Sequence, residues 1–313
     1  MTMRVQKLWI AAVALLIALP AVAQDRRGDE QTERISRKFK IGATGRLALS
    51  NISGDIAVTA GSGDEVTLEA VKRTRGDRSE LSSVVIEIDD RPGRVDIRTR
   101  HTARRDRSSV DYTVTVPRGA TVDLASISGN VRATNLQGPL RAQSVSGTVA
   151  VSGSTNVEFA KSISGDVELT GSAPEARITG STVSGTVRAR DLKTRALALS
   201  AISGNAEVNN VEAERLEVKS VSGDVIFAGA AVRNARYEFN THSGSVRLTL
   251  ASAPGFELNA NTFSGDVRSD LPVTINDARP RRGPGRSIRV VVGDGAATLT
   301  VSTFSGNVVI RRQ

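Results

Sequence analysis

Cysteine is absent from this chain of 313 residues, and aromatic residues make up only 3% of it. Without cysteine no disulfide framework can form, and no lipid can be attached to a thiol after processing. The chain has two histidines, far apart, so no cluster of zinc ligands is available, and we predict no metal and no cofactor. Because sugar-binding platforms stack exposed aromatics on pyranose rings, the composition also argues against such a platform.

The first 23 residues have the organisation of a secretory signal peptide. Arg4 and Lys7 precede an apolar run from Leu8 to Pro20, and Ala21-Val22-Ala23 supplies small residues at the cleavage positions. The run is shorter than the roughly 20 apolar residues that span a bilayer. We therefore expect cleavage, no transmembrane segment in the mature chain, and residence in the periplasm, with the cell surface or the medium as alternatives. The polar residues 24–34 are predicted to be disordered.

A serine-glycine corner followed by Asp, Asn, Thr or Ser recurs ten times along the chain. From Gly129 to Gly265 successive corners are 18 to 21 residues apart, a spacing typical of stacked-repeat architectures. Glycine fits such a corner because it adopts positive φ without a Cβ clash. The predicted structural corners are Gly54, Gly129, Gly147, Gly165, Gly185, Gly204, Gly223, Gly244, Gly265 and Gly306.

Apolar residues alternate on both sides of each corner. They stand seven and five residues before the glycine, as Leu216 and Val218 do for Gly223, and two and four residues after it, as Val225 and Phe227 do. This period-2 pattern predicts two short, half-buried strands in each repeat. Stacked rungs of about 19 residues would bury these side chains in one continuous column. The sequence thus predicts an all-β single-stranded β-solenoid, with a β-sandwich of hairpins as the alternative.

The regular solenoid is predicted over residues 123–270. Residues 35–122 contain degenerate copies of the same repeat. We expect them to form an N-terminal β region and cap, because solenoid ends need protected edges. A basic loop rich in proline, glycine and arginine is predicted over 271–286. Residues 287–313 are then expected to form the final rung and a C-terminal cap.

The formal net charge of +9 falls to +7 when Arg4 and Lys7 leave with the signal peptide. The excess arginine is clustered outside the regular repeats, where it can attract anionic surfaces. In an exported protein these are envelope components such as lipid headgroups or wall polymers, and nucleic acid is not expected; solvated loops are the alternative reading. The predicted anion-binding residues are Arg98, Arg100, Arg104, Arg105, Arg107, Arg279, Arg281, Arg282 and Arg286.

No catalytic residue is predicted. A serine that recurs at all ten corners, such as Ser128, has no base placed beside it by the sequence. Calcium would need several converging oxygens, and Asp follows only four of the ten glycines. His101 is expected in an exposed loop. His242 stands two residues before Gly244, where other repeats hold Ile, Val or Phe, and is expected to be a substituted core position.

The chain resembles the bacterial putative-adhesin domain of unknown function with β-strand repeats. The resemblance is carried by the residues from Leu47 to Ile56, those from Glu65 to Ala70, and the Ser-Gly-Asp/Asn corners up to Val308, so it covers nearly the whole mature chain. It implies a single-stranded, right-handed β-helix and transfers no catalytic residues.

Two functions remain open from the sequence. The first is a non-catalytic, adhesin-like exported envelope protein, a binding or structural scaffold for an anionic envelope component or another envelope protein. The second is a polysaccharide-active lyase or hydrolase on a β-helical scaffold. A cleft of convergent carboxylates and arginines would favour the enzyme, whereas flat sides of Ser, Thr and Asn would favour the scaffold.

Overall fold

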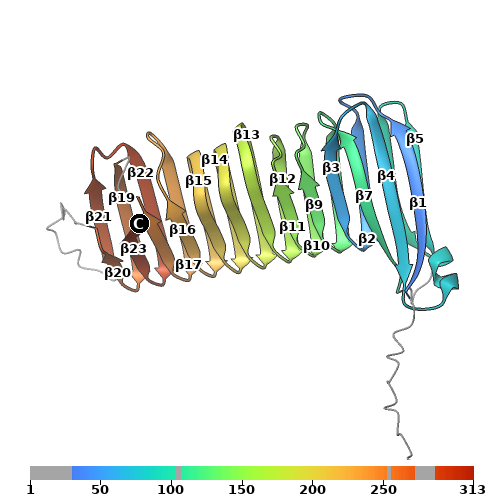
Figure 1. The fold of residues 1–313 in the computed structure, drawn as a ribbon. Coiled ribbons are helices and arrows are strands. Elements are labelled where there is room, and N and C mark those ends of the chain that lie inside the picture. The colour runs from blue at the N-terminus through green and yellow to red at the C-terminus, as the bar shows by residue number, and fades with distance from the viewer. Residues whose placement is uncertain (1–29, 103–106, 252–254, 272–285) are drawn as a thin grey trace, which may run out of the picture.

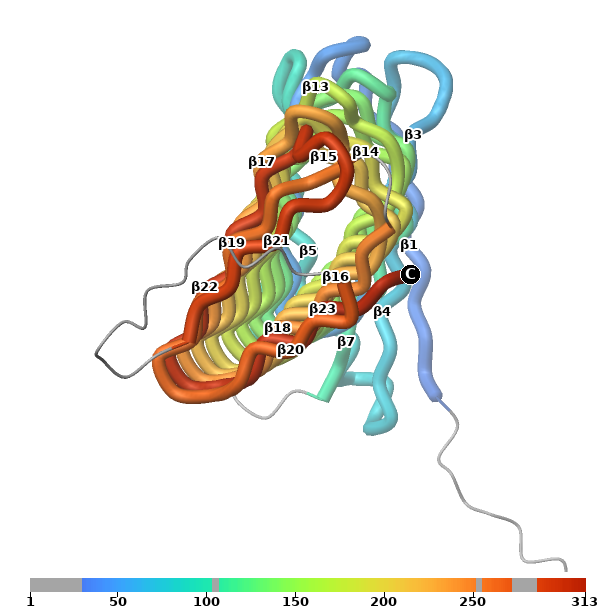
Figure 2. Tube along the Cα trace, turned by 90° about the vertical axis from the view of Figure 1, so that its left-hand side faces the viewer, coloured from blue at the N-terminus to red at the C-terminus, as the bar shows by residue number. Residues whose placement is uncertain are grey.

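The computed structural model describes residues 30–102, 107–251, 255–271 and 286–313. In these ranges the fold is all-β apart from the short 3-10 helix η1 (Arg78–Ser83). Successive rungs stack side by side into an elongated rod (Figure 1). Viewed along the rod, two sheets face each other across a flattened cross-section (Figure 2). The predicted signal peptide lies outside the described residues.

The first sheet contains the strands that precede the corners, and all its rungs pair in parallel, with Ser128 opposite Ser146 for example. In spatial order its strands are β6 (Arg94–His101), β2 (Arg46–Ser53), β8 (Thr121–Ser128), β10 (Leu140–Ser146), β12 (Val157–Ser164), the second parts of β13 (Val167–Ser184), β14 (Val187–Ser203) and β15 (Ala206–Ser222), then β17 (Arg236–Ser243), β22 (Ala297–Ser305) and β19 (Phe256–Ser264).

The second sheet contains the strands that follow the corners, again in parallel. Its order is β7 (Ser109–Pro117), β3 (Ile56–Gly61), β9 (Val131–Thr134), β11 (Val149–Ser152), the first parts of β13, β14 and β15, then β16 (Val225–Gly229), β18 (Val246–Leu250), β23 (Val308–Arg312) and β20 (Val267–Ser269). A sandwich of hairpins would pair consecutive strands antiparallel. The parallel pairing between rungs therefore favours the solenoid-like stack over that alternative.

Antiparallel strands cover the N-terminal end of the rod. β4 (Glu65–Thr74) pairs with β7, β1 (Gln31–Lys40) pairs with β4, and β5 (Val84–Arg91) pairs with β6. The predicted disorder over 24–34 is wrong for its last residues, because β1 begins at Gln31 and its backbone pairs with β4 along its whole length. The stack also begins earlier than residue 123, since β2 and β3 already form a rung in register with β8 and β9.

The last rung of the sequence is not the last rung of the stack. β22 lies between β17 and β19, and β21 (Arg286–Val292) pairs antiparallel with β19. The prediction of a terminal rung and cap over 287–313 is therefore wrong in its order. The physical reason is that repeats with the same corner can stack in either order. The spacing of the corners determines how the residues of one rung are arranged, but it does not determine which rungs lie next to each other. Residues 272–285 of the predicted basic loop lie outside the described residues.

The core is the predicted column of inward side chains. Leu216, Val218, Val225 and Phe227 are each at most 1% exposed, and the equivalent positions of the other rungs continue the column. Aromatic side chains widen it locally, with the rings of Phe227 and Phe239 5.3 Å apart. These buried rows are where the period-2 pattern of the sequence places them.

The corner glycines make the closest contact between rungs. Gly147 has a φ of +151°, and a Cβ placed on it would overlap the carbonyl oxygen of Gly129. The same relation holds between Gly129 and Gly54 and between Gly165 and Gly147. The Gly129 N–H meanwhile donates to the Ser146 carbonyl at 2.9 Å. Glycine is therefore required by the stacking itself as well as by its φ.

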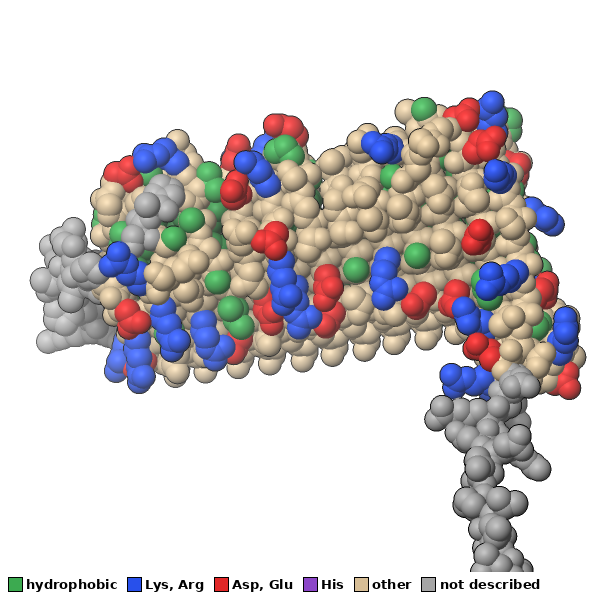
Figure 3. Space-filling model, viewed as in Figure 1, with side chains coloured by type: hydrophobic (Ala, Val, Ile, Leu, Met, Phe, Trp, Pro, Cys, Tyr) green, Lys and Arg blue, Asp and Glu red, His purple; other side chains and the backbone are tan. Residues whose placement is uncertain are grey.

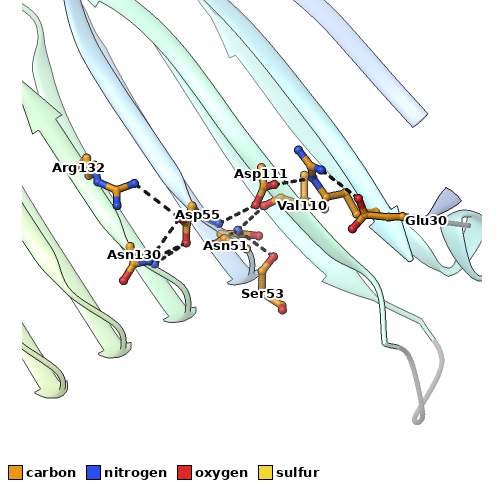
Figure 4. Close-up of polar contacts among 10 residues, drawn as sticks. Glu30, Asn51, Ser53, Asp55, Val110, Asp111, Asn130 and Arg132 are labelled. Carbon is orange, nitrogen blue, oxygen red and sulfur yellow. Dashed lines mark hydrogen bonds and ion pairs between the residues drawn. The ribbon is translucent and has the colours of Figure 1, made fainter. Parts of the chain in front are cut away.

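Side chains beside each glycine tie one rung to the next. The Ser144 hydroxyl donates to the Gly129 carbonyl at 3.0 Å. The side chain that follows the glycine also reaches a neighbouring rung, since Asp55 Oδ1 accepts from the Asn130 N–H at 2.9 Å while the Asp55 N–H donates to Asp111 at 3.0 Å (Figure 4). The groups that these polar side chains satisfy therefore belong to the neighbouring rungs.

Replacing a stacked glycine is expected to be far more damaging than replacing a glycine with the same backbone requirement in open space. In Gly147→Ala the new Cβ meets backbone that cannot move without opening the rung, so we expect a loss of several kcal/mol in the free energy of unfolding. Gly63 also has positive φ, +116°, but nothing lies within 4 Å of its Cβ position. Gly63→Ala should cost only about 1–3 kcal/mol. Urea unfolding of both variants tests this, and equal losses would contradict it.

The corner hydroxyl offers a second matched pair. Ser144→Ala leaves the Gly129 carbonyl without its side-chain donor and should cost about 1 kcal/mol. The Ser126 hydroxyl has no hydrogen-bond partner among the described residues, because Asn51 Nδ2 already donates to the Gly54 carbonyl at 2.9 Å. Ser126→Ala should therefore leave the free energy of unfolding unchanged or raise it slightly. Chemical denaturation measures both, and a comparable loss in the two variants would rule out the inter-rung bond as the cause.

Candidate binding surface

An exposed row of apolar side chains runs along the first sheet beside the corners. It occupies the position two residues before each glycine, where the alternation of the strand turns the side chain outward. We call this row the apolar ladder. Its members with 42–53% of their surface exposed are Ile127, Val145, Ile163, Val183, Ile202, Val221, Phe304 and Phe263, and Ile52 begins the row in the first rung.

His242 fills the ladder position of its own rung and is exposed, so the expectation of a core position is wrong. Its ring stacks on Phe304 with centroids 4.9 Å apart, and Phe304 stacks on Phe263 at the same distance. The physical reason is the phase of the strand, since the inward side chains stand at odd offsets before the glycine and this position is even. His101 ends β6 and is half-buried, whereas the sequence predicted an exposed loop.

A groove of about 720 Å³ lies beside the ladder. Its wall is the ladder from Ile52 to Ile202, and its floor consists of residues three and four positions before the glycines. Many floor residues are small, such as Ser50, Ala125 and Ser200, so the larger ladder side chains rise above them as a step. The groove crosses six rungs, which at about 4.8 Å per rung makes it roughly 24 Å long.

A smaller cavity of about 280 Å³ opens on the outer face of the same sheet, beside the N-terminal half of the groove, with lining residues from β6 to β12. We call it the arginine pocket. It shares Ser50, Ala125 and Gln143 with the groove, so the two cavities adjoin. Its charged lining residues are Arg46, Arg94, Arg98, Arg141, Asp96 and Asp123.

Most cations of the arginine pocket are paired. Arg94 forms an ion pair with Asp96 at 2.9 Å, and Arg46 forms one with Asp123. Arg98 is exposed and makes no side-chain hydrogen bond or ion pair with any described residue. The pocket therefore carries more positive than negative charge, and one guanidinium in it is available to a ligand.

Among the described residues, the arginines that the sequence predicted for anion binding do not share one site. Arg100 pairs with Glu87 at 3.2 Å, Arg286 pairs with Asp266 at the C-terminal end of the rod, and Arg107 is exposed. Five of them lie outside the described residues: Arg104, Arg105, Arg279, Arg281 and Arg282.

The companions of Arg98 were missed by the sequence analysis. Arg46, Arg94 and Arg141 come from three different strands and are aligned only by the register of β6, β2, β8 and β10. They could have been found by comparing the outward-facing positions of neighbouring repeats with one another, instead of looking for arginines that are close together along the chain.

Carboxylates converge on Arg188, the arrangement that a polysaccharide-active enzyme would need. Arg188 contacts Asp166 at 2.7 Å and Glu207 at 3.0 Å. Burial opposes the ionisation of Asp166, but the Thr186 N–H and the Arg188 guanidinium outweigh it and hold the pKa of Asp166 below its usual value. A carboxylate that stays ionised suits an ion pair between rungs and not a general acid.

Charged side chains of both signs follow one another along the face of the rod shown in Figure 3. Among the described residues no group of three or more His, Asp or Glu is placed to hold a metal ion. Within the same ranges, no helix has the length and apolar character needed to cross a bilayer.

Comparison with known proteins identifies a family. The model of the Toastrack DUF4097 family matches residues 140–311, so the match leaves out the N-terminal strands that the sequence resemblance included. No curated protein matches the chain.

Several solved structures are similar to the chain. A structure named as a putative adhesin from Bacteroides fragilis is 14% identical, with 90% of this chain and 97% of that chain covered and a TM-score of 0.41. One named as a putative lipid binding protein from Parabacteroides distasonis is 15% identical, with 88% and 96% covered and a TM-score of 0.35. A putative adhesin from Parabacteroides merdae is 13% identical, with 90% and 96% covered and a TM-score of 0.31.

A buried tyrosine at the N-terminal end of the groove makes the stability of this end depend on pH. The Tyr112 hydroxyl lies 2.7 Å from Thr99 Oγ1, and Thr99 lines the groove. Burial raises the pKa of Tyr112 to about 12, and the hydrogen bond with Thr99 opposes that rise. The folded state therefore favours the neutral phenol. Its stabilisation is complete below the unfolded pKa near 10 and is lost as the pH rises towards 12.

We expect the wild-type chain to lose about 1.4 kcal/mol of unfolding free energy per pH unit more than Tyr112→Phe between pH 10 and 11.5. The second buried tyrosine, Tyr237, is the same in both proteins and cancels from the difference. Urea unfolding at a series of pH values gives this difference directly. Parallel pH profiles for the two proteins would show that the Tyr112 phenol does not titrate in this way.

Proposed function

The chain belongs to the Toastrack DUF4097 family, and we propose that it is a non-catalytic binding scaffold of the cell envelope whose binding surface is the apolar ladder with its groove. The observation that carries the proposal is the ladder itself. Its eight large apolar side chains, each about half exposed, stand in one file along the rod. Contiguous apolar patches of this extent are rare on soluble monomers and mark interaction sites.

The stack makes this surface rigid. Each ladder residue is followed by a corner whose backbone is bonded to the next rung, as with the Gly147 N–H and the Ser164 carbonyl at 3.2 Å. Binding therefore orders little backbone, and the entropic cost of association is small. The proposed location is the periplasm, which is supported by the signal-peptide pattern of residues 1–23.

The enzyme alternative finds less support. The carboxylates that line the arginine pocket, Asp96 and Asp123, are each held in an ion pair with an arginine. A polysaccharide lyase or hydrolase needs a carboxyl or another group that is free to exchange a proton with the substrate. Apart from Asn51, Gln143 and Lys161, the groove offers hydroxyls and aliphatic side chains, and no carboxylate of the described residues lines it, which suits binding without chemistry.

Co-sedimentation of the mature protein with separated bacterial membrane and cell-wall fractions tests the proposal. We expect binding to one fraction, and a loss of at least tenfold in the triple variant Ile127→Thr/Ile163→Thr/Ile202→Thr, because three half-exposed side chains lose apolar contact worth about 2 kcal/mol in total. Threonine is also β-branched, so the strands keep their preferred conformation.

The matched control is Val85→Thr/Val291→Thr, which also replaces an apolar β-branched side chain by threonine at exposed positions in β5 and β21, outside the ladder. It should bind as the wild-type chain does. Equal binding by the triple variant and the wild-type chain would refute the ladder as the binding surface, and absence of binding to either fraction would refute the proposed scaffold.

A further inference from the structure

We propose that the groove and the arginine pocket together bind one anionic phospholipid, with an acyl chain along the ladder and the phosphate at Arg98. This proposal rests on the proposed function, because it names the ligand class of the same surface. Its basis is that two unlike cavities adjoin. A long groove walled by aliphatic side chains shares three lining residues with a pocket that four arginines and two aspartates also line.

The groove suits a hydrocarbon chain better than a peptide. It lies on the outer face of a sheet whose backbone groups are already used between rungs, as in the parallel pairing of β8 with β10. An extended peptide placed there would leave its own N–H and C=O groups without the strand edge that normally receives them. An acyl chain has no such groups, and it needs only a continuous apolar wall, which Ile127, Val145 and Ile163 provide in successive rungs.

The arginine pocket suits a phosphate. Arg98 has no partner among the described residues, and Arg46 Nε is a buried N–H without an acceptor. Guanidinium groups bind phosphate oxygens with strong, charge-assisted hydrogen bonds. Lys161 adds a further cation on this side, because its ammonium lies over the Phe159 ring, 4.7 Å from the centroid, and Phe159 lines the arginine pocket.

Phe159 reaches the pocket through an irregularity of the stack. The pairing of β10 with β12 shifts between Leu140 and Arg141, so that Val157 is buried and Phe159 stands opposite Arg141 on the outer face. The repeat is thus broken in the fourth of the six rungs that the groove crosses. Arg98 pairs with Ser50 of the first groove rung, so the proposed headgroup site lies at the N-terminal end of the groove.

Isothermal titration of the mature protein with three soluble probes tests the proposal. The probes are lysophosphatidylglycerol below its micelle concentration, lysophosphatidylcholine of the same chain length, and glycerol phosphate alone. We expect lysophosphatidylglycerol to bind at least tenfold more tightly than lysophosphatidylcholine, and glycerol phosphate to bind at least a hundredfold more weakly than lysophosphatidylglycerol. The preference for the anionic headgroup should decrease as salt is added.

Two variants separate the two cavities. Arg98→Gln should abolish the preference for lysophosphatidylglycerol and keep the chain-dependent binding, whereas the ladder triple variant should lose both lipids. Arg100→Gln is the matched control, because Arg100 is two residues away on the same strand but pairs with Glu87 and does not line the pocket. It should keep the preference within twofold.

The outcomes that overturn the proposal are distinct from those that overturn the proposed function. If the ladder-dependent sedimentation holds but neither lysolipid binds, the scaffold stands and the phospholipid proposal fails. If Arg98→Gln still prefers lysophosphatidylglycerol to lysophosphatidylcholine, Arg98 is not the headgroup site. If glycerol phosphate binds as tightly as lysophosphatidylglycerol, the protein has an anion site but no acyl-chain site, and the phospholipid proposal fails. If light scattering shows a dimer that the ladder triple variant dissociates, a second copy covers the ladder and the phospholipid proposal is wrong.

Discussion

The contact of glycine on glycine between neighbouring rungs is the constraint on which the rest of the structure depends. At Gly147 a single added carbon would overlap the carbonyl of Gly129, so the corners can stack only in direct register. The hydroxyl of Ser144 and the amide of Thr148, which bonds to Asn130 Oδ1 at 3.0 Å, then fasten each corner to its neighbour. Because the corners form a straight column, every residue at a fixed distance from them forms a straight row. The buried column and the apolar ladder are both products of this register.

The chemistry of the outward rows supports the proposed binding role of the ladder. The side chains two and four residues before the glycine share one outer face of one strand, and solvent reaches both rows. The first row holds Ile127, Val145 and Ile163, while the second holds Ala125, Gln143 and Lys161 in the same rungs. A preference of strands for β-branched residues would act on both rows alike. Strand propensity and burial therefore do not account for the ladder, whereas the proposed apolar ligand would.

Much of the fold follows from local spacing, and the parts that do not follow from it depend on register between distant segments. The alternation around Gly223 locates the buried Leu216 and Phe227 correctly, because the pattern repeats within a few residues. The same alternation places His242 outside, and the sequence analysis erred there because it weighed the apolar character of the position above its phase.

The position of β22 between β17 and β19 has no local signal, since the corner of Gly306 is equally able to follow Gly244 or Gly265. The arginine pocket joins Arg46, Arg94 and Arg141, which line one cavity only when the four strands β6, β2, β8 and β10 pair. A sheet face with a fixed period also distinguishes poorly between binding positions along its length, because every rung offers nearly the same side chains to a ligand. Selectivity in such a protein must lie where the repeat is broken. Here one break is β6, which carries the unpaired Arg98 and lies beyond the first rung of the groove, and another is the register shift at Phe159 in the fourth rung.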